Sequence, residues 1–507
     1  MPISDDDARR IKPYVSALDG DVFALAGLPE EVIAVLFAYY SRSKDDLRTN
    51  LAKLLADQDL GVEGGGPAAP FKLATEKAKS FHEKWVVGYG HASVAEHAVV
   101  HLAIENVSIV VSKLLEDLRL ASYTEKSTRY VLWDEDSFHP LPELGSKEPL
   151  YTKTCKTLFR TYLELVPKVE AEVRLRHVRA ASQTEGAYNA QVRAKTFDLL
   201  RGLLPAGTKT NLGFTANARA IEMLLSKMLA SPLQEARAVA TAMHMHSASV
   251  APTLVKYVAP NEYRKTLREK LPWLASAAGI HGTDEGEDTE TYGQAVRLLR
   301  WDTDALQRVA QALAYDGADA LWNAGGLAAS IGRTTGPKLE AFVRGALEAR
   351  GKFDPAPRAF EAATLTFEIT MDFGGYRDMQ RHRMLSPFPQ RLTCRLGAEV
   401  PRELDDMKLG KPFREALEQA ENAWTAIDDT NPWEAQYVVP LAFRLRTLWQ
   451  MNLRELFHVV ELRSARQGHP SYRMVAQQIY KATVAALPWL RDLIRVDMNE
   501  YELTRNP

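Results

Sequence analysis

Two segments of this chain look like copies of one element, and each copy has lost a different part of it. The later segment, residues 381–393, reads RHRMLSPFPQRLT, and the earlier one, residues 117–130, reads DLRLASYTEKSTRY. The two superpose on Ser386 and Ser122. The earlier copy keeps Ser-x-Arg-Tyr but lacks Arg-His-Arg, whereas the later copy has the reverse. The sequence therefore predicts a duplicated protein whose halves have divided one binding site between them.

The two halves also match outside this element. Helical segments resemble one another by chance, so several matches in the same order carry more weight than one. Three further pairs of identical residues occur in the same order in both halves. They are Glu96 with Glu361, Asn217 with Asn452, and Arg219 with Arg454, and the last two pairs are separated by the same number of residues.

An acidic, glycine-rich stretch at residues 279–293 has no hydrophobic periodicity and is typical of a linker. The chain has 507 residues, which is too many for one ordinary core. We therefore predict two domains, residues 1–280 and 290–507.

Composition excludes several classes of protein. The net charge of −2 does not indicate a partner such as nucleic acid or an anionic membrane. No apolar run approaches the roughly 18 residues of a membrane span, and the polar N-terminus is no signal peptide. Two cysteines, Cys155 and Cys394, cannot form a disulfide framework, so we expect a reducing, cytoplasmic location.

Most of the sequence has helical periodicity, including residues 31–40, 154–178 and 216–247. Pro167 and Pro232 should bend or split the two longer helices. The few strand candidates are short, and the best are residues 101–110 and 364–370. This pattern favours an α+β fold, rich in helices and with small antiparallel sheets, over a doubly wound parallel sheet.

The second half concentrates arginines, whose planar guanidinium suits phosphate and imide oxygens and stays charged when partly buried. On a helix that begins near Asn452, Arg463 follows about three turns later, so both lie near one face. For any single arginine, a solvated surface position is the better interpretation. The set is more informative than its members: Arg381, Arg383, Arg446, Arg454 and Arg463.

A polar motif at residues 90–97, GHASVAEH, stands in an apolar neighbourhood. Its histidines are too widely spaced for a metal-binding HExxH motif, so we predict no metal site. Ser93 followed by Glu96 fits a helix-capping box, and capping is compatible with a cofactor contact because helix N-termini attract anions. Nucleophilic catalysis has little support, since neither cysteine has an evident base and no G-x-S-x-G elbow occurs.

At these residues the chain resembles the flavin-dependent thymidylate synthases. Their signature is Arg-His-Arg, then Ser, then a Ser-x-Arg-Tyr ending. The polar motif at 90–97, the segment 121–130 (ASYTEKSTRY), both Asn-x-Arg pairs and Glu461-Leu-Arg463 also resemble family motifs. The resemblance covers most of both halves. It implies two tandem thymidylate synthase-like domains.

The resemblance also implies roles for individual residues. Arg463 would be the catalytic residue, placed beside the uracil so that it favours the N3-ionised base. The implied dUMP-binding residues are Glu125, Ser127, Arg129, Arg381, Arg446 and Arg463. The implied FAD-binding residues are His91, Ser93, Glu96, Glu125, Arg381, His382, Arg383, Asn452 and Arg454, and Asn217 and Arg219 could contact flavin at a second location.

The reaction implied is methylation of dUMP to dTMP, with FAD as cofactor, methylenetetrahydrofolate as carbon donor and NADPH as reductant. The chain departs from the family in complementary ways. In the register of the repeat, Asn211 stands opposite Arg446, and Met228 stands opposite Arg463. One composite site could therefore be intact and the other dead, and a homodimer would imitate the family's tetramer. The alternatives are an enzyme acting on another pyrimidine nucleotide, and a non-catalytic or repurposed paralogue that binds flavin or a pyrimidine nucleotide.

Overall fold

The protein is described from a computed structural model, which covers residues 4–40, 43–56, 92–280, 296–318 and 321–503. The predicted linker beyond residue 280 and the predicted flavin contact His91 lie outside these residues.

Within the described residues the chain forms two compact units. The first unit comprises residues 1–107, 114–125 and 210–281, and the second comprises residues 108–113, 126–209 and 282–507. Residues 126–209 of the first sequence half therefore pack as part of the second unit. The predicted domain limits, 1–280 and 290–507, concern the sequence repeat and stay a prediction.

The first unit begins with three short helices, α1 (Asp5–Ile11), α2 (Glu30–Tyr40) and α3 (Leu47–Ala56). Ser4 caps α1 by accepting a hydrogen bond from the backbone N–H of Asp7. The three helices pack around a small apolar core that includes Ile11, Val32, Leu36 and Leu51. The helix predicted at 31–40 is confirmed as α2.

A three-stranded sheet forms the middle of the first unit. Its strands are β1 (Val99–Ser108), β2 (Ala121–Glu125) and β3 (Lys209–Asn217), in the order β1-β3-β2, and β2 pairs antiparallel with β3. The short 3-10 helix η4 (Ala92–Glu96) precedes β1. The strand predicted at 101–110 is confirmed as β1.

The helix predicted at 216–247 is partly wrong. Residues 209–217 are the strand β3, and the remainder forms α8 (Ala218–Leu229) and α9 (Gln234–Val250). The break between these helices falls at Pro232, as predicted, because proline cannot continue the hydrogen-bond ladder. A further helix, α10 (Glu262–Ala277), ends the first unit.

The second unit contains a four-stranded antiparallel sheet in the order β4-β5-β7-β6. The strands are β4 (Val296–Trp301), β5 (Thr364–Asp372), β6 (Ser386–Pro389) and β7 (Arg444–Asn452). Alternate residues of β5 are buried, as expected for a strand with one face toward the core. The predicted strand at 364–370 is confirmed as β5.

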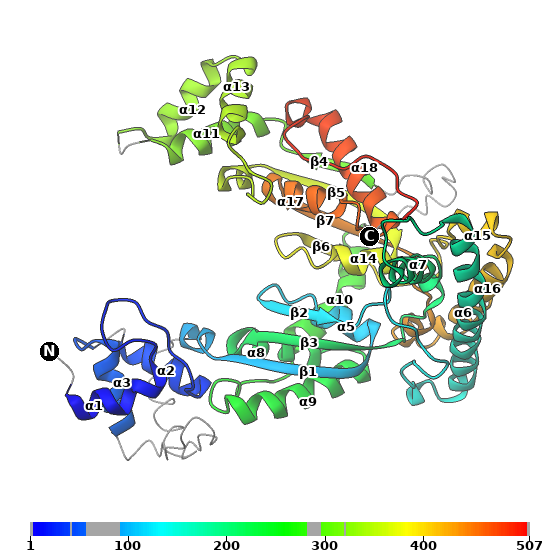
Figure 1. Ribbon diagram of the computed structural model, residues 1–507, viewed down its shortest axis with the longest axis horizontal. Helices are drawn as coiled ribbons and strands as arrows, with labels where there is room; N and C mark the ends of the chain where they lie inside the picture. Colours follow the sequence, from blue (N-terminus) through cyan, green and yellow to red (C-terminus); the bar gives the residue numbers. More distant parts are fainter. Residues whose placement is uncertain (1–3, 41–42, 57–91, 281–295, 319–320, 504–507) are drawn as a thin grey trace. The chain divides into compact units, whose positions relative to one another are not determined.

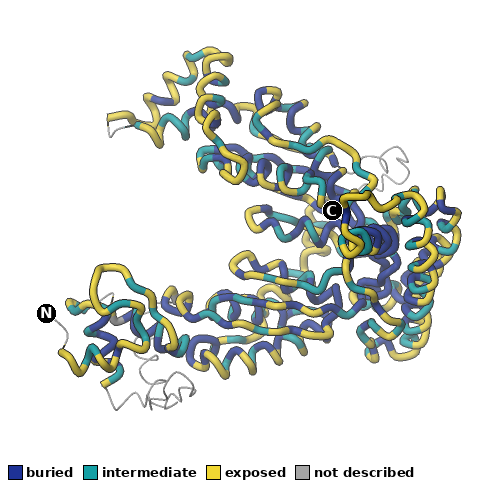
Figure 2. The backbone as a smooth tube through the Cα atoms, viewed as in Figure 1, coloured by how far each residue is buried: buried dark blue, intermediate teal, exposed yellow. Residues whose placement is uncertain are grey.

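Most helices of the second unit belong to the second sequence half: α11 (Ala305–Asp316), α12 (Ala324–Arg333), α13 (Gly336–Leu347), α14 (Phe373–Met379), α15 (Arg402–Asp406), α16 (Gly410–Asp428), α17 (Leu453–Arg463) and α18 (Pro470–Ala486). Two long helices and most of α5 (Ile109–Leu115) come from the first half. α6 (Glu148–Arg176) continues through Pro167 as one helix and packs beside α16 (Figure 1). α7 (Glu185–Leu200) is buried along most of its C-terminal part (Figure 2).

The fold is helix-rich α+β with small antiparallel sheets, as predicted. The element order is repeated along the chain, since β1, α5 (Ile109–Leu115), β2, α6, β3, α8 and α9 are followed later by β5, α14, β6, α16, β7, α17 and α18 in the same sequence of types. Each series has one further α-helix between its second and third strands, α7 of 16 residues in the first and α15 of 5 residues in the second. The longer α7 accounts for part of the extra length of the first half.

None of the helices in the described residues is long and apolar enough to cross a membrane. Both cysteines are buried and free. Burial raises the pKa of the Cys155 and Cys394 thiols, so neither is a thiolate at neutral pH.

Candidate functional site

The second compact unit contains both parts of the divided motif. Ser127 and Arg129 come from the first sequence half, and Arg381, His382 and Arg463 come from the second. The first-half residues belong to this unit because the chain leaves β2 at Glu125 and returns to the first sheet only at β3. One packing unit thus gathers residues that are hundreds of positions apart in sequence.

Arg129 is held by two parallel hydrogen bonds to a carboxylate of α7. Its Nε and Nη2 donate to Oδ1 and Oδ2 of Asp198, each at 2.6 Å. Its Nη1 donates to the backbone oxygen of Gln467 at 3.3 Å, which joins the first-half loop to the segment after α17. Burial acts to lower the pKa of Arg129, but the hydrogen bonds and charge of Asp198 outweigh it and raise that pKa.

A second carboxylate lies among the remaining arginines. Asp378, near the end of α14, pairs with Nη1 of Arg201 at 3.5 Å. Burial acts to raise the pKa of Asp378, but the positive charges of Arg201, Arg463 and Arg381 outweigh it and lower that pKa. Asp378 also acts electrostatically on Arg129. Residues of both halves therefore share one electrostatic neighbourhood.

Arg201 is a member of this neighbourhood that the sequence reasoning missed. Only 4% of it is exposed, and its Nη2 is buried with no hydrogen-bond partner among the described residues. A signal was present, because Lys195, Asp198 and Arg201 recur every three residues in an otherwise apolar stretch and so lie near one helical face. A charged face on a buried helix needs partners. Lys195 and Arg201 pair with Glu403 and Asp378 of the second half, and Asp198 pairs with Arg129 of the first.

A cavity of about 180 Å³ borders this cluster. Its lining is mostly apolar but includes Arg201, Asp198 and Asp372. Asp372 caps α14 by accepting from the backbone N–H of Gly375, and it also accepts from the hydroxyl of Ser471. Burial raises the pKa of Asp372 to about 6 although the charge of Arg201 opposes the shift.

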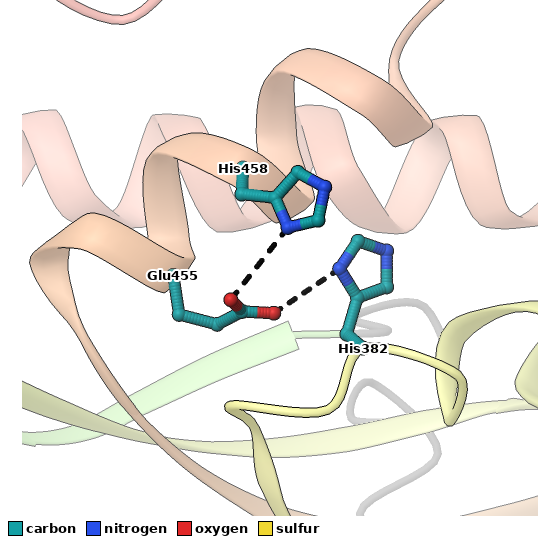
Figure 3. A group of neighbouring side chains, drawn as sticks. All are labelled: His382, Glu455 and His458. Atoms are coloured by element: carbon teal, nitrogen blue, oxygen red, sulfur yellow. Dashed lines mark hydrogen bonds and ion pairs between the residues drawn. The ribbon is translucent and has the colours of Figure 1, made fainter. Parts of the chain in front are cut away.

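His382 is buried and lies beside Glu455 and His458 of α17 (Figure 3). Its Nδ1 lies 3.2 Å from Oε1 of Glu455, and its Nε2 accepts a hydrogen bond of 2.8 Å from Nε of Arg463. The second carboxylate oxygen of Glu455 lies 3.6 Å from Nδ1 of His458, which is mostly exposed. His382, Glu455 and His458 are close enough to be considered as metal ligands. No metal site was predicted from the sequence.

The Asn-x-Arg pairs form local structure at the start of equivalent helices. Asn452 caps α17 by accepting from the backbone N–H of Glu455. Nε and Nη1 of Arg454 donate to the backbone oxygen of Ala356 and to Oε1 of Glu361, at 2.9 and 2.8 Å. The predicted flavin contacts of Asn452 and Arg454 stay predictions.

The other predicted residues of the second half lie in the same unit. Arg446 is on β7, and its Nε is buried with no hydrogen-bond partner among the described residues. Arg383 is exposed, and Arg381 is half-buried. The hydroxyl of Ser127 accepts from the backbone N–H of Arg129 at 3.2 Å.

The remaining predicted flavin contacts belong to the first unit. Ser93 is exposed and lies inside η4 rather than before it, so it does not begin that helix as the capping box predicted. Glu96 instead accepts from Nη1 of Arg219 at 2.5 Å. Glu125 ends β2, where it is paired with Leu212. Their predicted roles stay predictions.

Comparison with known proteins identifies the family. The family model described as thymidylate synthase complementing protein matches two segments, residues 36–253 and 298–489, as a tandem repeat would. A protein of Chlamydia muridarum named UPF0159 protein is 35% identical over 520 residues, covering 99% of this chain and 97% of that protein. A Thermoplasma acidophilum protein, UPF0159 protein Ta1429, is 28% identical over 476 residues, covering 86% of this chain and 92% of its own.

Shorter matches connect the chain to proteins with a named activity. A flavin-dependent thymidylate synthase of Thermococcus onnurineus is 31% identical over 158 residues, covering 31% of this chain and 56% of that protein. A crystal structure of a flavin-dependent thymidylate synthase from Helicobacter pylori, complexed with FAD and dUMP, aligns with 40% of this chain and 100% of its own, at 16% identity and a TM-score of 0.31. The extent of the family match shows that this chain belongs to the thymidylate synthase complementing protein family, the family of the flavin-dependent thymidylate synthases.

Proposed function

We propose that this protein is a flavin-dependent thymidylate synthase that methylates dUMP to dTMP. Methylenetetrahydrofolate would donate the carbon, and NADPH would supply the reducing equivalents. Membership of the family supports the reaction class. The observation that carries the proposal is that one compact unit contains Arg129 of the first half together with Arg381 and Arg463 of the second. Random decay after duplication would have damaged both halves of the same site.

The donor groups of this unit fit anionic ligands such as a nucleotide phosphate or the diphosphate of FAD. Nη2 of Arg201 and Nε of Arg446 are buried N–H groups without a hydrogen-bond partner among the described residues. Such groups are costly unless a ligand satisfies them, and arginine pairs well with phosphate oxygens. FAD, when bound, supplies the redox chemistry, while the protein binds and orients the reactants.

The residues divide into two groups by proposed role. Arg463 would lie beside the uracil and favour the N3-ionised base, which raises the electron density at the carbon that is methylated. The other proposed dUMP contacts are Glu125, Ser127, Arg129, Arg381 and Arg446. The proposed FAD contacts are His91, Ser93, Glu96, Glu125, Arg381, His382, Arg383, Asn452 and Arg454. We further propose a homodimer and a cytoplasmic location.

The first test is a spectrum followed by an activity assay. We expect purified protein to carry a flavin absorption band or to acquire it with FAD, and dUMP to shift that band. We then expect dTMP to form when dUMP, methylenetetrahydrofolate and NADPH are supplied together. A protein that binds both flavin and dUMP but never forms dTMP would contradict the synthase assignment.

One observation favours a second candidate, a repurposed or non-catalytic paralogue that binds flavin or a pyrimidine nucleotide. Asp198 already occupies two N–H groups of Arg129, and Asp378 pairs with Arg201. Both carboxylates compete with an anionic ligand for these arginines. Comparing the affinities of uridine, dUMP and dCMP identifies a protein repurposed for another pyrimidine, because the synthase requires dUMP to bind better than the other two. A non-catalytic protein that prefers dUMP is identified by the absence of dTMP formation.

A further inference from the structure

We propose that Glu455 and His382 are positioning residues that hold the guanidinium of Arg463 through a continuous chain of hydrogen bonds. The inference rests on the proposed role of Arg463 beside the pyrimidine. It adds a second role to the flavin contact proposed for His382, and it gives Glu455, which no motif singled out, a role in the site.

The chain spans two turns of one helix. Glu455 lies in the first turn of α17 and Arg463 is its last residue, so their backbones are about 12 Å apart at 1.5 Å per residue. His382 enters from the loop after α14 and bridges them. Its Nδ1 lies 3.2 Å from Oε1 of Glu455 (Figure 3), and its Nε2 lies 2.8 Å from Nε of Arg463. The side chains of His382 and Glu455 are only 1% and 6% exposed.

The partners fix the tautomer of His382. An arginine N–H can only donate, so Nε2 of the imidazole must be the acceptor. In a neutral imidazole the proton then resides on Nδ1, which faces the carboxylate of Glu455. Glu455 is therefore needed to orient the ring and to keep its acceptor nitrogen toward Arg463.

The electrostatics of the buried groups agree with this assignment. Burial, together with the charge of Arg463, lowers the pKa of His382 to about 4 against the opposing influence of Glu455, so the ring is neutral at pH 7. Burial acts to raise the pKa of Glu455, but hydrogen bonds from His382 and His458 outweigh it and lower the pKa to about 2. An ionised acceptor thus faces a neutral donor, as the chain requires.

A metal ion on His382, Glu455 and His458 is the competing interpretation of the same cluster. A metal would need the lone pair of Nδ1 of His382, because Nε2 is bound to Arg463. The ring proton would then move to Nε2 and face an N–H of Arg463, so two donors would meet. The metal and the hydrogen bond to Arg463 are mutually exclusive, and the observed geometry is that of the hydrogen-bonded chain.

The first sequence half provides an internal comparison. In the register of the repeat, His382 corresponds to Leu118, and Glu455, His458 and Arg463 correspond to Ala220, Met223 and Met228. All four polar groups are replaced by apolar ones, and Leu118, Ala220 and Met228 are buried. Loss of the arginine is thus accompanied by loss of the residues that would hold it, as expected if they serve the arginine rather than the helix.

Anchoring Nε has a clear consequence for ligand binding. The two terminal nitrogens of Arg463, Nη1 and Nη2, take no part in the chain, and the guanidinium carbon lies 5.6 Å from the ring centre of Tyr472. Fixing Nε restricts the rotation of a long, flexible side chain, so the plane of the guanidinium is set before a ligand arrives. Loss of such support lets the guanidinium move, and a misplacement of about 1 Å can lower the rate about 100-fold.

The experiment combines nitrogen NMR with kinetics on FAD-loaded, full-length protein. Spectra of protein labelled with ¹⁵N in histidine and arginine, assigned with His382→Gln and Arg463→Ala, should show His382 protonated at Nδ1 and not at Nε2, and a slowly exchanging Nε–H for Arg463. Glu455→Met should abolish that protection and lower kcat about tenfold or more while flavin content is retained. Glu455→Gln keeps an acceptor oxygen and should restore most of both signals.

Several outcomes would overturn the proposal. They are a wild-type His382 protonated at Nε2, an Arg463 Nε–H that exchanges freely, or a Glu455→Met variant with normal kcat. Stoichiometric Zn²⁺ binding that disappears in Glu455→Met would establish the metal site instead. The NMR readouts do not depend on turnover, so an inactive wild type with the expected tautomer would refute the synthase assignment and leave the chain intact.

Discussion

Two regions of the molecule, one from each sequence half, have the same backbone design but different chemistry. In the first unit β3 leads into α8, and in the second unit β7 leads into α17. In each, an asparagine ends the strand and accepts from the backbone N–H three residues later, at 2.8 Å. In each, the arginine two residues after that asparagine pairs with a glutamate that precedes the first long strand.

The difference lies along the next turns of the helix. α17 carries Glu455, His458 and Arg463, whereas α8 carries Ala220, Met223 and Met228 at the matching positions. Capping, the ion pair and the buried face are sufficient to form the element, since both copies have them. Glu455, His458 and Arg463 have no polar counterpart in α8, so the element forms without them. We interpret their presence in α17 alone as serving a function in the second unit.

We expect the largest effect on the rate when Arg463 is replaced by methionine, the residue found at the matching position of the first half, Met228. Arg463→Met should lower dTMP formation by about 100- to 1000-fold, the usual cost of removing a donor that stabilises developing charge. The helix should survive, since Met228 occupies the same place in α8. Steady-state rates at saturating dUMP measure the loss. Arg333→Ala, an exposed arginine of α12, serves as the matched control and should have the wild-type rate.

The pH dependence of stability should differ between wild type and His382→Gln. The pKa of His382 falls from 6.5 to about 4 on folding, so between these values the unfolded chain binds a proton that the folded chain does not. Stability from this group is complete above pH 6.5 and is lost as the pH falls toward 4, by up to about 3 kcal/mol. Asp372 acts in the opposite direction, because its pKa is raised to about 6.

Asp372 is common to both proteins, so the difference between them reports His382 together with its effect on Glu455, whose pKa His382 lowers. The groups that act on His382 are Glu455, His458 and Arg463, all on α17. Urea unfolding at several pH values is the measurement. Wild type should lose more stability than His382→Gln over this range, and parallel curves would show that His382 is not buried as a neutral ring.

A smaller effect is expected on flavin retention. Arg381→Ala removes a positive charge from the motif that is intact only in the second half, and it should weaken FAD binding about 10- to 100-fold, in line with loss of a charge-assisted hydrogen bond. The corresponding residue of the first half is Asp117, so Asp117→Ala should retain flavin fully. Flavin absorbance per protein after gel filtration measures this, and equal retention in both variants would falsify the assignment of Arg381.

The smallest effect on rate is expected at Asn211, opposite Arg446 in the repeat. The side chain of Asn211 accepts from the backbone N–H of Asn106, which has a left-handed φ of 56°. Asn211 therefore stabilises a left-handed residue within β1, and Asn211→Arg should cost about 1 kcal/mol of stability without changing turnover. A large gain in rate would contradict the division of labour between the halves.

Much of the fold could be predicted from local sequence patterns. The helix at 30–40, the strands β1 and β5, and the break at Pro232 all follow from periodicity and proline chemistry. The strand β7 was missed although Leu445, Thr447, Trp449 and Met451 are alternately buried. The Asn-x-Arg motif drew attention to the helix that follows, and the strand before it was not recognised.

The electrostatic core of the site was harder to predict. The pair Arg201–Asp378 depends on residues 126–209 packing with the second half, and the pair Arg129–Asp198 joins distant positions within that segment. No short-range pattern reports either contact. Glu455 was missed for a similar reason, because its partner His382 lies far away in sequence. The motif located the arginines, but only the structure identifies the carboxylates that hold them.

We propose that residues of both sequence halves act at one pyrimidine nucleotide site. The most direct measurement is the visible spectrum of the FAD-loaded protein during a titration with dUMP, for wild type, Ser127→Ala and Arg463→Ala. We expect dUMP to shift the flavin band in wild type and each single variant to weaken or abolish the shift. A normal shift in Ser127→Ala together with a lost shift in Arg463→Ala would contradict the claim, because the second half alone would then form the site.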